Sequence, residues 1–338
     1  MHIVAKTIRA AYGEALAKLG GEYSNVVVLD ADVSSSTQSC IFREAYPERF
    51  FNVGIAESNM AAMAAGFAAS GKIPFVNTFA AFITSIGLVS ARSFGSYSKL
   101  PLKLAGAYSG LSDMFDGPSH HSIEDIAVMR ALPNFKIFVP SDATQTAWTV
   151  KNAIDDPGPV YLRLSRDTFP DMYKESDTFE TGKGKILREG GDATVIACGL
   201  MVGNAMEAAL KLAISGIEIT VVDMFCIKPL DKELVCECAA KTGAIVTAEE
   251  HNVIGGLGGA VSETLCETGL YVPVGFTGIK DCHTECGPYA ALQKKYGLDA
   301  DAIIDKVTEV ITKKSRRLQM SLHEGLLRCT AATGGRKP

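Results

Sequence analysis

The 338-residue sequence has no extended basic region. Its 33 lysines and arginines are outnumbered by 38 aspartates and glutamates, which gives a formal net charge of −5 at pH 7. A local group of cations at Lys313, Lys314, Arg316 and Arg317 fits the solvated face of a last helix. Because no positive field attracts phosphate groups, nucleic acid is not expected as a partner.

An export signal and a disulfide framework are also missing. Residues 1–21 mix Lys6, Arg9, Glu14 and Lys18 with apolar side chains, which is typical of an amphipathic helix and differs from the apolar core of a signal peptide. The nine cysteines are odd in number and show no framework spacing. We therefore expect reduced cysteines that serve as small core residues, and a cytoplasmic location.

One stretch, from Ile73 to Ala91, contains no charged residue. A helix that spans a bilayer needs about 20 predominantly apolar residues. Polar and helix-breaking residues interrupt this stretch at Pro74, Asn77, Thr78, Thr84, Ser85, Gly87 and Ser90. The pattern therefore predicts a buried strand followed by a buried helix, and no membrane partner.

Apolar strand-like runs alternate with helical patterns along most of the chain. Strands are predicted at 25–32, 74–79, 101–106, 135–140 and 159–164, and again at 193–199, 218–223, 244–250 and 272–276. Helices are predicted at 57–69, 122–131, 142–155, 201–214, 231–241, 257–268 and 300–313. Strands that are apolar on both faces and alternate with helices are typical of α/β domains with parallel sheets.

A change in composition separates the two series. Residues 169–190 are rich in charge, Gly and Pro and are predicted to link a first domain, 1–168, to a smaller second domain, 191–315. Residues 316–338 show no convincing pattern and are expected to form a disordered or peripheral tail. Ligands of parallel sheets gather at the carboxyl ends of the strands, where Asp30, Asp32, Phe79 and Arg166 fall.

Glu57 is the one charged residue in the segment FNVGIAESNMAAMAAGFAASG, residues 51–71. A carboxylate with no cation beside it must stay in water, take up a proton or bind a ligand, because burying a lone charge costs several kcal/mol. An exposed glutamate in a first helical turn would also fit. Two later segments favour chemistry: FVNTFAAFITSI (75–86) carries Phe79 and Phe82, and DGPSHHSIED (116–125) places an acid and two histidines around a Gly-Pro turn.

Glu-Ser-Asn-Met, Phe-x-x-Phe and Asp-Gly-Pro-Ser-His, in this order, resemble the pyrimidine-binding half of a transketolase. The resemblance spans about residues 5–313. It implies a thiamine-pyrimidine-binding doubly wound parallel sheet, followed by a smaller transketolase C-terminal-like α/β domain. It also implies thiamine diphosphate as the cofactor and transfer of a two-carbon ketol unit from a ketose or its phosphate to an aldose or its phosphate.

The resemblance assigns cofactor roles to three residues. Gly54-Ile55-Ala56-Glu57 matches the family's Gly-Ile-x-Glu, so Glu57 is expected to share a proton with the pyrimidine in a dry pocket and to act in catalysis. Phe82 is expected to stack on the pyrimidine and Phe79 to wall the pocket. Two phenylalanines at this spacing would otherwise be read as core.

Further residues match the family's sugar site. Asp116 and His120 match an acid and a histidine that contact the sugar hydroxyls, and an imidazole can accept and return a hydroxyl proton near neutral pH. Tyr108 and His121 replace a histidine and a glutamine of the family, and Phe115 lies in an altered run just before the motif. These departures leave the identity of the sugar open, including phosphate against sulfonate.

An anion site is implied by a second group of residues. Arg166, Ser36 and Arg9 resemble the set that holds the terminal phosphate of a sugar substrate, and guanidinium groups bind phosphate oxygens in a bidentate manner. Arg166 could instead be a surface arginine that pairs with its neighbour Asp167 or with another acid. Asp32 matches an aspartate of the family that binds a substrate hydroxyl.

The family's metal motif, Gly-Asp-Gly followed downstream by Asn, is missing, since Gly191-Asp192 is followed by Ala193. The resemblance therefore implies one subunit of a split transketolase in an α2β2 assembly. Its partner would be an N-terminal transketolase subunit that carries Gly-Asp-Gly and holds the diphosphate and Mg²⁺ or Ca²⁺. This chain would be active only with that partner.

Two alternatives stay open. The chain could be the beta-type subunit of another thiamine enzyme, a 2-oxoacid dehydrogenase or a deoxyxylulose-phosphate synthase, although Asp116, His120 and Arg166 favour a sugar phosphate. It could also be a non-catalytic α/β subunit, which would have little reason to keep Glu57 beside Phe82. GGLGGA (255–260) does not fit the dinucleotide fingerprint, and Cys282, His283 and Cys286 lack the second ligand pair of a zinc site.

Overall fold

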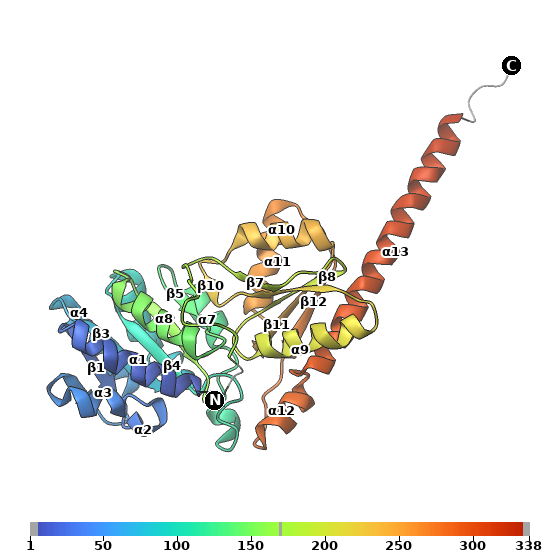
Figure 1. Ribbon diagram of the computed structural model, residues 1–338. Helices are drawn as coiled ribbons and strands as arrows, with labels where there is room; N and C mark the ends of the chain where they lie inside the picture. Colours follow the sequence, from blue (N-terminus) through green and yellow to red (C-terminus); the bar gives the residue numbers. More distant parts are fainter. Residues whose placement is uncertain (1–5, 169–170, 334–338) are drawn as a thin grey trace.

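Each of the two predicted series of strands and helices folds around its own sheet, and the two domains lie side by side (Figure 1). The computed structural model describes residues 6–168 and 171–333. Residues 1–5 of the predicted first domain, 169–170 of the predicted linker and 334–338 of the predicted tail lie outside the described residues. The α/β class and the two-domain organisation predicted from the sequence are confirmed.

The first sheet has seven strands in the order β10-β5-β6-β4-β3-β1-β2. Its strands are β1 (Val26–Asp30), β2 (Phe50–Asn52), β3 (Ile73–Phe79), β4 (Lys103–Ala107), β5 (Lys136–Phe138), β6 (Val160–Leu164) and β10 (Cys226–Lys228). Neighbouring strands are parallel except for β10, which pairs antiparallel with β5. Since β10 comes from the second half of the sequence, the chain returns once to the first sheet.

Helices cover both faces of this sheet because alternate strand residues point to opposite sides. Val26 and Val28 share a buried cluster with α1 (Ile8–Glu22) and α8 (Ala143–Asp155). Val27 and Leu29 share another with α4 (Glu57–Ala69) and α7 (Asp125–Ala131). Side chains cap two of these helices, since Thr7 accepts from Ala10 N at the start of α1 and Asp142 accepts from Gln145 N at the start of α8.

The segment from Ile73 to Ala91 begins with the predicted strand, β3, but the single buried helix predicted after it is wrong. Short helices α5 (Ala80–Ile83) and α6 (Leu88–Ser90) lead into a π-helical segment, η2 (Ala91–Tyr97). Val89 and Tyr97 are 72% and 86% exposed, so their side chains lie on the protein surface and not in the core. None of the helices in the described ranges combines the length and apolar content needed to cross a membrane.

The second sheet has five strands in the order β12-β11-β8-β9-β7. They are β7 (Lys185–Arg188), β8 (Ala193–Ala197), β9 (Ile219–Asp223), β11 (Ile245–Asn252) and β12 (Val274–Ile279), and only β7 is antiparallel among these described strands. The helices are α9 (Met201–Ile214), α10 (Lys232–Thr242), α11 (Leu257–Thr268), α12 (Tyr289–Tyr296) and α13 (Ala300–Thr333). β7 falls within the predicted linker. α13 continues through residues 316–333 of the predicted tail and projects from the second domain (Figure 1).

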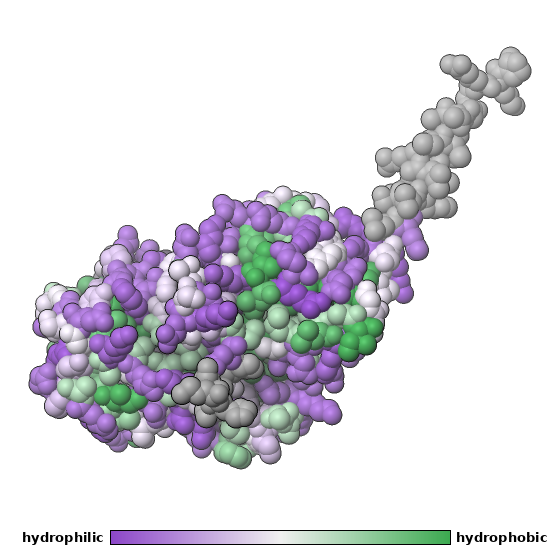
Figure 2. Space-filling model, in the orientation of Figure 1, coloured by the Kyte–Doolittle hydropathy of each residue, from purple (hydrophilic) through white to green (hydrophobic). Residues whose placement is uncertain are grey.

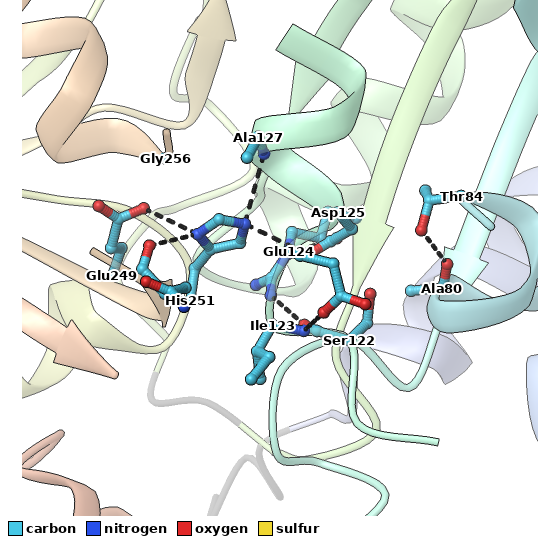
Figure 3. Close-up of polar contacts among 12 residues, drawn as sticks. Ala80, Thr84, Ser122, Ile123, Glu124, Asp125, Ala127, Glu249, His251 and Gly256 are labelled. Carbon is cyan, nitrogen blue, oxygen red and sulfur yellow. Dashed lines mark hydrogen bonds and ion pairs between the residues drawn. The ribbon is translucent and has the colours of Figure 1, made fainter. Parts of the chain in front are cut away.

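The two domains share a buried polar interface as well as one continuous hydrophobic cluster. Arg163 of β6 forms a buried ion pair with Asp125 of α7, 2.8 Å from Nε to Oδ2, and donates to the carbonyl oxygen of Glu250 at 2.9 Å. Figure 3 shows His251 of β11 between Glu249 and the first turn of α7. Glu249 in turn accepts from Leu257 N at 2.7 Å, so it caps α11. This network fixes the second domain against the first.

Candidate functional site

The candidate residues lie along the carboxyl ends of four adjacent parallel strands, β6, β4, β3 and β1. Arg166 follows β6, Tyr108 follows β4, and Phe79 ends β3. Asp30 ends β1, and its buried carboxylate accepts from Val33 N, Thr37 Oγ1 and Ser39 Oγ at 2.7 to 3.0 Å. Burial raises the pKa of Asp30. This carboxylate therefore holds both ends of α2 (Ser34–Thr37), the short helix that carries Ser36.

Glu57 is a buried carboxylate without a counter-ion among the residues that the structure describes. It is the first residue of α4, is 4% exposed, and accepts from Thr78 Oγ1 at 3.3 Å. No Lys, Arg or His nitrogen of the described ranges lies within 4.0 Å of its oxygens. The alternative of an exposed glutamate in the first turn is therefore wrong. A hydrogen-bonding ligand would satisfy the acid better than its present hydroxyl neighbour does.

Four rings form one group at the carboxyl ends of β3 and β4. Phe79, next to Thr78, stacks on Tyr108 with ring centroids 4.9 Å apart and lies 5.9 Å from Phe82. His120 points an edge at both phenylalanines, with centroids 5.0 Å from Phe82 and 5.8 Å from Phe79. The Ser119 hydroxyl lies 3.0 Å from His120 Nδ1. The two predicted phenylalanines and the predicted histidine are thus one aromatic group on the edge of the sheet.

An acidic cluster lies behind His120. A carboxylate oxygen of Asp113, a carboxylate oxygen of Asp116 and a ring nitrogen of His120 lie within 4.8 Å of one another. Asp113 is fully buried, and neither of its carboxylate oxygens has a hydrogen-bond partner among the described residues. Burial and the neighbouring Asp116 carboxylate raise the pKa of Asp113 to about 6. Arg166 Nη1 lies 3.6 Å from Asp113 Oδ1, so we interpret the cluster as the counter-charge of an arginine and not as a metal site.

Two of the three residues predicted to bind an anion, Arg9 and Arg166, meet at Tyr108, and the third, Ser36, contacts Arg9. Arg9 Nη1 donates to the Tyr108 hydroxyl at 2.9 Å and to the Ser36 carbonyl at 3.2 Å. The Arg166 guanidinium carbon lies 5.0 Å from the Tyr108 ring centroid, and that of Arg9 lies 5.6 Å from it. Two guanidinium groups therefore contact one phenol ring. The alternative was an arginine paired with Asp167 or another acid, and Arg166 does lie beside another acid, Asp113, while Asp167 is not among its described ion pairs.

Asp32 is the predicted site residue with the fewest links to the others. Its backbone is left-handed, with φ of 65°, and its Oδ1 accepts from Asn52 Nδ2 at 2.7 Å. It is exposed at the carboxyl end of β1. The described contacts do not join it to Arg9, Ser36 or Arg166, so its role as a hydroxyl ligand stays a prediction.

The second domain supports the loop that carries the sugar-site residues. Glu250 Oε1 accepts from Leu111 N at 3.2 Å and from the Tyr289 hydroxyl at 2.7 Å. Gly110 has φ of 64°, and a Cβ atom there would lie 2.2 Å from Glu250 Oε2, so a side chain does not fit. Thr284 Oγ1 lies 2.6 Å from His121 Nδ1. Burial raises the pKa of Glu250 to about 7 and lowers the pKa of His121.

Sequence reasoning missed four residues that shape the site: Thr78, Asp113, Glu250 and Tyr289. Thr78 follows Asn77 in a strand and carries no signal of its own. Asp113 could have been noticed as an acid three residues before Asp116 within an otherwise uncharged run. Glu250 is 139 residues from Leu111 in the sequence, and no local pattern could connect them.

Comparisons with known proteins agree with the geometry. Residues 5–171 match the family model "Transketolase, pyrimidine binding domain", and residues 182–303 match "Transketolase, C-terminal domain". The chain is 42% identical over 313 residues to a putative transketolase C-terminal section of Methanocaldococcus jannaschii, with 92% of this chain and 98% of that protein covered. It is 38% identical over 310 residues to a 6-deoxy-6-sulfo-D-fructose transketolase subunit of Clostridium sp. strain MSTE9, with 92% and 96% covered.

A solved structure extends this similarity to three dimensions. A split gene transketolase, described as an inactive beta4 tetramer, superposes with a TM-score of 0.84 and 46% sequence identity. The match covers 92% of this chain and 100% of that chain. The similarity therefore includes both domains and the arrangement of one against the other.

Proposed function

Since the chain belongs to the transketolase family, we propose that it is the subunit of a split transketolase that binds the pyrimidine of thiamine diphosphate and the sugar substrate. The observation that carries the proposal is the buried carboxylate of Glu57, which has no counter-ion among the described residues and accepts from Thr78, the residue before Phe79. A non-catalytic subunit would leave this arrangement without a purpose.

The residues fit the proposed cofactor. A pyrimidine offers a ring nitrogen that can share a proton with Glu57 and a flat face that can lie against Phe82. Phe82 is only partly buried, in contrast to Phe79, which is 9% exposed. Phe82 therefore offers ring surface to a ligand, while the ring of Phe79 is stacked on Tyr108.

When bound, thiamine diphosphate would supply a centre that stabilises carbanions during cleavage of the ketose. Glu57, buried and hydrogen-bonded to Thr78, would hold the proton that the pyrimidine nitrogen shares. Of the two ring nitrogens of His120, Nδ1 lies within hydrogen-bond distance of the Ser119 hydroxyl, and Nε2 has no partner among the described residues. Nε2 would therefore accept and return a hydroxyl proton of the sugar. Asp116, beside His120, would accept a hydrogen bond from a sugar hydroxyl.

The metal and the diphosphate are assigned to a partner chain. The sequence contains no Gly-Asp-Gly, and the described residues offer only the Asp113 cluster as grouped metal ligands, where Arg166 lies close. The residues present therefore do not fit a resident Mg²⁺ or Ca²⁺ site. An N-terminal transketolase subunit with that motif would complete the site, in an α2β2 assembly.

An apolar surface next to Glu57 supports a partner. Six large hydrophobic side chains on and beside α4, α6 and η2 are 37% to 86% exposed: Ile55, Met63, Ile86, Val89, Phe94 and Tyr97. We call this the α4–η2 surface. By contrast, the face shown in Figure 2 is mostly hydrophilic, with small hydrophobic areas over α9 and α11. Exposed apolar clusters of this kind mark protein interfaces.

The substrates proposed are a ketose donor and an aldose acceptor, each with an anionic far end near Arg9 and Arg166. One relative is named for a sulfonated ketose, 6-deoxy-6-sulfo-D-fructose, and another for apulose 4-phosphate. Both names pair a ketose with an anionic group. A sulfonated and a phosphorylated ketose are therefore the first donors to test.

Glu57→Gln tests the proposal, because the substitution keeps the shape of the side chain and removes the proton that Glu57 would share. In the complex with the partner chain, we expect ketol transfer to fall about 10²-fold or more. Hydrogen–deuterium exchange at the thiazolium carbon of bound thiamine diphosphate, followed by quenched NMR, should slow as well.

The matched control is Glu22→Gln at the exposed end of α1, which removes a carboxylate distant from the site. It should leave exchange and transfer unchanged. Unchanged exchange in Glu57→Gln would show that Glu57 is structural and would remove the main support for the proposed function.

A further inference from the structure

Arg166 is not a free cation in this structure, although it follows β6 at the edge of the site. The buried Asp113 carboxylate lies 3.6 Å from its Nη1 atom, and the Arg166 side chain is one-third exposed. The Ser112 hydroxyl accepts from Arg166 N at 3.1 Å, which ties the arginine to the loop that carries Asp113. The resemblance to transketolases gave no role to Asp113.

We propose that Asp113 is a specificity-determining residue, an internal counter-ion of Arg166 that makes the site favour a substrate whose far end carries one negative charge over one that carries two. The inference rests on the proposed function for the identity of the substrate. The pairing of Asp113 with Arg166 does not depend on it.

The charges around the site lead to this conclusion. Arg9 and Arg166 face Tyr108 and supply two positive charges, and Asp113 cancels one of them. A phosphate monoester is largely a dianion at pH 7.5, since its second pKa is about 6, whereas a sulfonate or a carboxylate carries one charge. A dianion beside Arg166 would be repelled by a buried carboxylate that water does not screen.

The other groups around Asp113 add no fixed positive charge, and Asp116 adds a second carboxyl group that would also oppose a dianion. Asp116 and His120 lie in the same turn, with ligand atoms within 4.8 Å of Asp113. His121 Nε2 lies 3.1 Å from the Asp113 carbonyl oxygen, and burial lowers the pKa of this imidazole. From the second domain, Cys286 packs against Gly117 of the turn. The described groups thus provide no further fixed cation beside Asp113 than Arg166.

Protonation of Asp113 would release the arginine. The pKa of Asp113, raised to about 6 by burial and by Asp116, leaves the carboxylate ionised at pH 7.5. Below about pH 6 it gains a proton and no longer competes for Arg166. Binding of a dianion should therefore strengthen as the pH falls, even when the charge of the dianion itself stays constant.

Sulfate is a suitable probe because it remains a dianion from pH 5.5 to 8. We would titrate sulfate into the full chain, without partner or cofactor, by isothermal titration calorimetry at pH 5.5, 6.5 and 7.5. Asp113→Asn should bind sulfate about tenfold more tightly than the native chain at pH 7.5, as expected when one unit charge is removed beside a partly buried anion. Arg166→Ala should bind it at least tenfold more weakly.

The pH series tests the Asp113 carboxyl group by comparing the native chain with the variant that lacks it. The native chain should tighten more between pH 7.5 and 5.5 than Asp113→Asn does. Asp155→Asn, on the surface of α8, changes the net charge equally and should behave as the native chain. If Asp113→Asn does not fold, Asp113→Ser removes the same charge with a smaller side chain.

With the partner chain, Asp113→Asn should lower the Michaelis constant for a phosphorylated acceptor about tenfold and leave that for glycolaldehyde unchanged. Structural damage would weaken binding, so tighter binding by Asp113→Asn cannot be explained by a damaged fold. Equal or weaker sulfate binding by Asp113→Asn overturns the inference. If the native complex shows no transfer activity but sulfate binding behaves as expected, the proposed function is contradicted. The inference that Asp113 is the counter-ion of Arg166 then still holds.

Discussion

At the scale of single residues, the site is distinguished by which charges have partners. Arg163 and Asp125 are both buried and paired at 2.8 Å, so they contribute to structure. Glu57 is buried without a cation beside it in the described part of the chain, and Arg166 keeps one-third of its side chain exposed. Charges that the fold leaves unsatisfied or open are the ones available to a ligand.

Arg166→Ala should therefore weaken binding of charged substrates without slowing the chemical step. We expect the Michaelis constant for sugar phosphates to rise about 10- to 150-fold, the effect of losing a charge-assisted bidentate contact of roughly 1.5 to 3 kcal/mol. Steady-state kinetics of the complex should show little change in turnover with glycolaldehyde, since uniform binding has been lost.

Arg166→Lys provides the comparison, since it keeps the charge but not the planar fork. It should fall between the native chain and Arg166→Ala. Equal effects of Arg166→Ala on charged and uncharged acceptors would contradict the anion site and favour a dehydrogenase-type subunit.

At the scale of elements, the strands were the easiest part to predict. β1, β3, β4, β6, β8 and β9 lie inside apolar runs because both of their faces are covered. β2 and β10 have three residues each, too few for a periodic pattern, and β10 joins its sheet through a contact distant in sequence. β7 lies at an edge within a charged segment. Residues 316–338 show no convincing periodic pattern, so the extension of α13 past residue 315 was not predicted.

The same difference holds for the site. Glu57, the two phenylalanines and His120 lie in local motifs, and the structure brings the three rings together. The loop that follows β4 is shaped by contacts across the domain interface, from Glu250 and Thr284 to Leu111 and His121. Those contacts depend on how the domains pack, which no local pattern records.

Glu250 links this loop to pH. Burial raises the pKa of Glu250 from the ordinary 4.5 to about 7. Between about pH 4.5 and pH 7, Glu250 is therefore protonated in the folded chain and ionised in the unfolded chain. The free energy of unfolding should therefore fall as the pH rises from about 4.5 to 7, because the folded state binds more protons. The loss attributable to Glu250 should be on the order of 3 kcal/mol by pH 8.

Glu250→Gln should remove this part of the pH dependence. The amide oxygen can still accept from Leu111 N and the Tyr289 hydroxyl, which both contact Oε1. Urea unfolding at pH 5 and pH 8 should show the variant near the native stability at pH 5 and more stable at pH 8. Asp113 and Asp223, whose pKa values are also raised to about 6, are present in both proteins and cancel in the comparison. Parallel pH profiles would show that Glu250 does not titrate as described.

At the scale of the whole molecule, the chain presents Glu57 at one end of the apolar α4–η2 surface. Glu57 begins α4, and Ile55, two residues earlier, is 81% exposed. Val89 and Tyr97 continue the α4–η2 surface from the elements that pack against α4. An interface at this place would cover the open side of the site, which the proposed reaction requires because it needs water excluded.

Val89→Glu combined with Tyr97→Glu should therefore prevent assembly with the partner while leaving the fold intact. Both side chains are largely exposed, so the stability of the isolated chain should change by less than about 1 kcal/mol. Two buried charges in an apolar interface should weaken association at least 100-fold. Sedimentation velocity of the mixed chains, with circular dichroism as the check on folding, measures both.

Ile214→Glu, at the 89% exposed end of α9 in the second domain, is the matched control and should assemble normally. Isolated native chain should show no tight Mg²⁺-dependent binding of thiamine diphosphate in calorimetry, because the proposed metal site belongs to the partner. It should gain that binding on mixing, and the double variant should not. Micromolar affinity of the isolated chain, or normal assembly of the double variant, would contradict a split enzyme joined through the α4–η2 surface.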